Sequence, residues 1–92
     1  MAIVAISTAP SGTSSSSLSK YVAKALKIAQ NDKRVRYRLD PMFTTLEGDL
    51  SDCLDVAQKM HEALFEAGAD RVGTVIKIDD RRDKKVNSLL KK

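Results

Sequence analysis

At 92 residues the chain has the length of one small domain, whose limited core makes extra burial through oligomerisation a reasonable expectation. Its single cysteine excludes an intrachain disulfide and paired-cysteine sites, and no apolar run approaches the ~18 residues of a membrane span, so we expect a cytoplasmic protein without a membrane partner. Residues 79–92 hold six basic and three acidic side chains, which account for most of the +4 net charge and favour a basic tail over a nucleic-acid-binding face.

The first half of the chain predicts a strand, a helix and a second strand. Residues 2–7 are apolar and β-branched, as expected of a buried strand, and the serine-rich residues 11–17 should connect it to a helix. The apolar positions at helical spacing are Leu18, Tyr21, Val22, Ala25, Leu26 and Ala29. Residues 35–40 alternate apolar and polar side chains up to Pro41, which predicts a half-buried edge strand.

The second half predicts a strand, a helix and a last strand. Residues 43–48 follow after a short turn and should form a hairpin with the preceding strand. Asp49 or Ser51 can cap the next helix, and Gly68 should end it. The expected apolar side of this helix comprises Leu50, Leu54, Ala57, His61, Leu64 and Phe65. Residues 71–79 complete the βαββαβ order, so one domain should span residues 1–80, with the basic tail over 81–92.

This order predicts an α+β fold of the ferredoxin-like type. Right-handed crossovers place both helices on one face of a four-stranded antiparallel sheet and leave the other face open. Strand alternation assigns to the open face Ile3, Ala5, Ser7, Thr45, Glu47, Gly73, Val75, Lys77 and Asp79. Because the centre of this face is apolar, we expect a second subunit to cover it.

Polar side chains on the open face predict a ligand site. Thr45 and Glu47 lie on one strand and Lys77 on another, and both strands should flank the first strand of the sheet. A carboxylate, an ammonium group and hydroxyls on a partly dry surface suit a small polar ring or an amine. An intersubunit salt bridge without a ligand is an equally weighted alternative.

Other reactive side chains favour structural roles. His61 has no second histidine or suitably placed cysteine, so neither a metal site nor a catalytic triad is predicted, and we expect it to be partly buried. Cys53, Met42 and Met60 should pack as core filler. Residues 10–17 can form an anion cradle at a helix start, although P-loop spacing is absent and a helix cap explains the serines.

Five segments in order resemble the family of small thiamine-binding proteins. They are residues 7–12 (STAPSG), 19–22 (SKYV), 45–48 (TLEG), 61–68 (HEALFEAG) and 76–84 (IKIDDRRDK), so the resemblance covers nearly the whole chain. It implies a ferredoxin-like fold, tetramers built as dimers of dimers, and non-enzymatic binding of thiamine or its hydroxymethylpyrimidine half, as a carrier or sensor that needs no cofactor.

Such a ligand suits the polar side chains of the open face. The amine and ring nitrogens of an aminopyrimidine can meet Glu47, Thr45 and Ser7, and a cationic thiazolium favours Glu47 or Asp79 nearby. Two other functions stay open. One is an oligomeric interaction or regulatory module without a ligand; the other is a small enzyme acting on a thiamine precursor, for which no spacing supplies a nucleophile and base.

Overall fold

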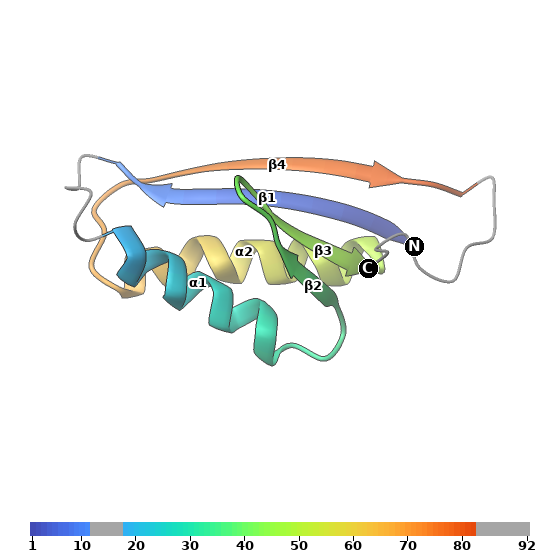
Figure 1. Cartoon of the computed structure of the whole chain (residues 1–92), viewed down its shortest axis with the longest axis horizontal. Coiled ribbons are helices and arrows are strands. Elements are labelled where there is room, and N and C mark those ends of the chain that lie inside the picture. Colours follow the sequence, from blue (N-terminus) through green and yellow to red (C-terminus); the bar gives the residue numbers. More distant parts are fainter. Residues whose placement is uncertain (12–17, 83–92) are drawn as a thin grey trace.

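The computed structural model describes residues 1–11 and 18–82 (Figure 1). In chain order its elements are β1 (Ala2–Pro10), α1 (Leu18–Asn31), β2 (Arg36–Leu39), β3 (Thr44–Gly48), α2 (Leu50–Glu66) and β4 (Val72–Asp80). The predicted βαββαβ order is therefore confirmed. The proposed anion cradle and most of the basic tail lie outside the described residues, so these two features and the domain limit at residue 80 stay predictions.

The four strands form one antiparallel sheet in the order β2-β3-β1-β4, which confirms the predicted fold and makes β2 an edge strand. Val4 lies opposite Leu46 on β3 and Ile78 on β4, so these three side chains point to the same face. Figure 1 shows both helices on one side of the sheet. We keep the term open face for the opposite side, which carries Ile3, Ala5, Ser7 and the residues opposite them.

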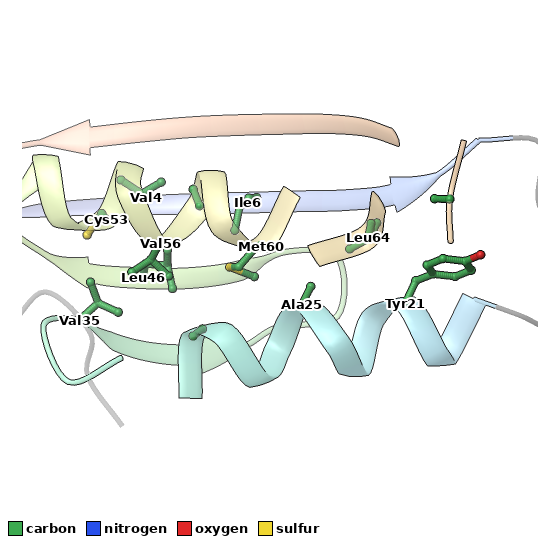
Figure 2. Close-up of a cluster of buried hydrophobic side chains, with 13 residues drawn as sticks. Val4, Ile6, Tyr21, Ala25, Val35, Leu46, Cys53, Val56, Met60 and Leu64 are labelled. Carbon is green, nitrogen blue, oxygen red and sulfur yellow. The ribbon is translucent and has the colours of Figure 1, made fainter. Parts of the chain in front are cut away.

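The core lies between the sheet and the two helices. Figure 2 shows side chains of β1, β3 and both helices converging there. Its largest fully buried members are Ile6, Leu46, Met60, Leu64, Val4, Val56 and Cys53. Cys53 and Met60 thus pack as predicted. Met42 does not: its exposed fraction is 78%, because it lies in the turn between β2 and β3, beyond the cover of either helix.

The buried side of α2 differs from the predicted one. It comprises Cys53, Val56, Ala57, Met60, Ala63 and Leu64. Leu54 and Phe65, which were expected there, are partly exposed. The reason is that α2 packs mainly against α1 and β1, and much less against the edge strand β4.

Two element ends show what tertiary pairing adds to local sequence. β1 continues beyond the predicted residue 7, because β4 runs beside it as far as the Pro10–Val72 pair. At the end of α2, Gly68 has a positive φ of 111°, and the amide of Ala69 donates to the carbonyl of Leu64 at 3.0 Å. This is a Schellman-type helix end, so Gly68 does terminate α2 as predicted.

Candidate ligand site on the open face

Two rows of side chains cross the open face. The first row holds Arg36, Glu47, Ile3 and Asp79, and the second holds Arg38, Thr45, Ala5 and Lys77. Four predicted site residues therefore lie in two adjacent rows. The fifth, Ser7, points to the same face one row further along, opposite Val75 and beyond the end of β3.

Glu47 is a buried carboxylate on the open face, where its neighbour Thr45 is buried too. Glu47 is only 2% exposed, although strand alternation places it on the uncovered face. Arg36, on the neighbouring edge strand, brings Nη1 to 3.5 Å from Oε1 of Glu47, while its own side chain stays 60% exposed. A buried charge needs such charged partners, and the sheet positions this carboxylate beside the centre of the open face.

Asp40 fixes the edge of the site and was missed by sequence reasoning. Thr45 donates its hydroxyl to Oδ2 of Asp40 at 2.6 Å, and Arg38 donates Nε to Oδ1 at 3.0 Å. These bonds, the Thr45 bond above all, lower the pKa of Asp40 from its ordinary value. The backbone amide of Asp40 donates to the backbone carbonyl of Phe43 at 2.9 Å, and this bond closes the turn between β2 and β3. The available signal was the Asp-Pro pair, which favours turn initiation.

A shallow hollow lies between the open face and this turn. Its volume is about 520 Å³, and its lining comprises Ala5, Thr45 and Lys77 from three strands together with residues 40–43. The structure thus brings Thr45 and Lys77 together in one concave surface. Glu47 lies two residues along β3 from Thr45, while Asp79 and Ser7 stand outside the hollow on the same face.

The remaining reactive groups of the described residues lie elsewhere. His61 is half-buried on the helix side, as predicted, and its Nδ1 lies 2.6 Å from the hydroxyl oxygen of Thr74. Burial raises the pKa of Cys53 to about 11, which makes its thiol unreactive. Residues 1–11 and 18–82 contain no cluster of metal-ligating side chains, and neither helix described there is long and apolar enough to span a membrane.

Comparison with known proteins decides the family. The family model for thiamine-binding proteins matches residues 4–92. The chain belongs to the thiamine-binding protein family. Within it, the chain is 49% identical over 88 residues to the UPF0045 protein YqgV of Bacillus subtilis, covering 92% of this chain and 85% of that one. It is also 49% identical over 75 residues to a UPF0045 protein of Methanothermobacter thermautotrophicus, covering 80% of this chain and 75% of that one.

Solved structures of the same architecture support the fold. The hypothetical protein MJ1052 of Methanocaldococcus jannaschii superposes with a TM-score of 0.84 at 33% identity, covering 96% of this chain and 87% of that one. A candidate thiamine biosynthesis/salvage protein of Thermotoga maritima superposes with a TM-score of 0.76 at 22% identity, covering 87% and 83%. Because the Thermotoga maritima protein is only 22% identical to this chain, its similarity concerns the fold alone.

Proposed function

We propose that this protein binds thiamine or its hydroxymethylpyrimidine half non-covalently on the open face, as a cytoplasmic carrier or sensor. Membership of the thiamine-binding family supports this ligand class. The observation that carries the proposal is the buried carboxylate of Glu47, held by the sheet beside a hollow lined by Thr45 and Lys77.

Each polar group on this face matches a part of such a ligand. Carboxylates accept hydrogen bonds and attract cations, so Glu47 and Asp79 suit the exocyclic amine and the thiazolium charge. Lys77 provides donors for a ring nitrogen or a phosphate, and the hydroxyl of Ser7 can donate or accept further along the face. The small side chain of Ala5 leaves space for a ring between them.

The same geometry favours binding without chemistry. Thr45 lines the hollow, and its hydroxyl donates to the carboxylate of Asp40 at 2.6 Å. Asp40 is therefore a potential base for this hydroxyl. The lowered pKa of Asp40, however, makes this carboxylate a poor proton acceptor. We therefore propose a binding protein rather than an enzyme.

We also propose that a second copy of the chain covers part of the open face, within a homotetramer. Val75 on this face is 60% exposed, which leaves apolar surface beside the site. A partner subunit there would convert an open hollow into an enclosed one, which a ligand of this size needs for strong binding.

The test is calorimetric titration of the purified protein with thiamine, thiamine phosphate and hydroxymethylpyrimidine. We expect saturable binding of at least one of them. Glu47→Gln keeps the shape of the side chain and removes its charge, so it should weaken binding roughly tenfold or more. Asp70→Asn, at an exposed acid between α2 and β4, is the matched control and should bind normally.

Two outcomes would contradict the proposal. Equal affinity of a folded Glu47→Gln variant would remove Glu47 from the site. Absence of heat with all three compounds, on a folded oligomer, would instead favour the interaction module.

A further inference from the structure

A groove lies between α1 and α2, on the side of the sheet that the helices cover (Figure 1). Its volume is about 440 Å³, and we call it the helix groove. Its lining residues are Lys24, Lys27, Ile28 and Asn31 of α1, Asp32 in the following loop, and Lys59 of α2. None of these residues lines the hollow on the open face, so the two concave surfaces are separate.

The lysines of α1 form a row that interactions within the helix do not explain. Lys20, Lys24 and Lys27 are four and three residues apart, so they lie on one side of α1, which contains no acidic residue. Like charges at these spacings destabilise a helix. Cations stabilise the last turn of a helix, but the last turn of α1 has no basic residue. The row therefore costs helix stability without a compensating contact inside α1.

The carboxylates beside the helix groove are already paired with other cations. Arg34 donates Nε to Oδ1 of Asp32 at 3.0 Å and Nη2 to Oδ2 at 2.8 Å, and its backbone amide donates to Oδ1 at 2.9 Å. Asp55 accepts from Nη2 of Arg34 at 2.7 Å and lies 3.2 Å from Nζ of Lys59. These acids consequently do little to neutralise the lysines of α1.

Lys24 and Lys27 have no carboxylate partner within residues 1–11 and 18–82, although both line the groove. Asn31 adds a side-chain amide, which can donate two hydrogen bonds. Ile28, which packs in part against the core, supplies an apolar surface between these polar groups. The helix groove thus combines ammonium and amide donors in one concave surface, which is the donor set that an anion requires.

We propose that the helix groove is an anion site for a compact polyphosphate group. An exposed lysine binds a single phosphate weakly, because water and salt screen the charges. A chain of phosphates can contact Lys24, Lys27 and Lys59 together, so several weak contacts act within one ligand. Inorganic triphosphate and the triphosphate chain of a nucleotide share this chemistry.

The neighbouring acids favour a compact ligand over an extended one. Asp32 lines the groove, and Asp52 and Asp55 are joined to it through Arg34. These carboxylates would repel a nucleic acid strand or an anionic bilayer that extended past the lysines. The site goes beyond the thiamine proposal, because it involves a different ligand and no residue of the open face.

The test is an amide NMR titration of the whole protein with inorganic triphosphate, ATP and inorganic phosphate in turn, in about 150 mM salt, where exposed charges more than about 8 Å apart are screened. We expect the resonances of Lys27, Ile28 and Asn31 to move most and to saturate with inorganic triphosphate, and inorganic phosphate to bind about tenfold more weakly. Tighter binding of ATP than of inorganic triphosphate would assign a nucleotide as the source, and equal or weaker binding would assign free polyphosphate. Unsaturable shifts at basic residues throughout the chain, equal affinity for phosphate, or no binding would each overturn the proposal.

Matched variants separate a defined site from general attraction to a basic protein. Lys27→Gln removes one charge from the groove and should weaken binding of inorganic triphosphate about threefold to fivefold. Lys20→Gln removes the same charge from the same helix, but Lys20 lies about two turns before Lys27 and does not line the groove, so affinity should stay unchanged. Lys27→Arg keeps the charge and should bind normally. Equal weakening by Lys27→Gln and Lys20→Gln, or a loss with Lys27→Arg as large as that with Lys27→Gln, would overturn the site.

Discussion

Gly48 ends β3 at a point of close backbone approach. A Cβ atom there would lie 3.1 Å from the backbone oxygen of Arg34, whereas at Gly73 on β4 the nearest atom would be the Ser11 hydroxyl oxygen at 3.9 Å. We predict that Gly48→Ala lowers the free energy of unfolding by about 1–3 kcal/mol, because backbone must shift. Gly73→Ala is the control and should be neutral or slightly stabilising. Urea unfolding measures both, and equal stability of the two variants would contradict the close contact.

Residue by residue, sequence alone predicted which face a side chain occupies better than how deeply it is buried. Strand alternation placed Glu47 on the open face, and the register confirms this. Its near-complete burial depends on neighbours such as Arg36 from another strand, which no local pattern contains. The bond between Thr8 and Thr74 joins residues 66 positions apart, so it too was beyond local reasoning.

Arg34 joins the loop before β2 to α2. Its guanidinium contacts Asp32 at 2.8 Å within the loop, and Asp55 at 2.7 Å and Asp52 at 3.5 Å on α2. Hydrogen bonding to Arg34 lowers the pKa of Asp32 from 3.8 to about 2, and it also lowers the pKa of Asp55. The three acids and the arginine therefore act as one surface cluster that links two elements.

This cluster predicts a pH-dependent stability difference. A carboxyl whose pKa is lower in the folded state stabilises the protein above its ordinary pKa, and this contribution is lost as the pH falls through the folded value. Arg34→Gln should therefore be less stable than the wild type at neutral pH, and the difference should shrink as the pH falls through about 2. Lys33→Gln, at the exposed neighbouring residue, is the control for loss of charge. Urea unfolding at neutral pH and near pH 2 measures the stability of each protein. A stability difference between wild type and Arg34→Gln that does not change with pH would contradict the prediction.

At the scale of elements, periodicity predicted each helix and strand found in residues 1–11 and 18–82, but it could not settle how far each extends or which side it buries. The pairing with β4 lengthens β1 to Pro10. This proline needs no N–H there, because the bonded Ser11–Arg71 pair places it in a non-hydrogen-bonded position. The buried side of α2 depends on where α1 packs, so Leu54 and Phe65 were misplaced.

The whole molecule leaves apolar surface along β4. Val75 on the open face is 60% exposed, and Ile76 and Ile78 on the other face are 42% and 45% exposed, because β4 is an edge strand that α2 covers only in part. A long edge strand with exposed apolar side chains is normally covered or blunted by charges. This surface therefore supports the proposed assembly of several copies.

We predict that Val75→Lys shifts the assembly to smaller species, because burying a lysine charge in an apolar contact is costly. Ala23→Lys, on the exposed side of α1, should leave the assembly unchanged. Light scattering coupled to size-exclusion chromatography measures both. A monomeric wild-type protein, or an assembly that ignores Val75→Lys, would contradict an interface on the open face.

Amide NMR during titration with thiamine tests whether a thiamine-related ligand binds the open face. We expect the resonances of Thr45, Glu47 and Lys77, which lie on the two strands flanking β1, to move most and to saturate together. Saturable binding of thiamine that leaves these three resonances in place, or no binding by the folded protein, would contradict binding at this face.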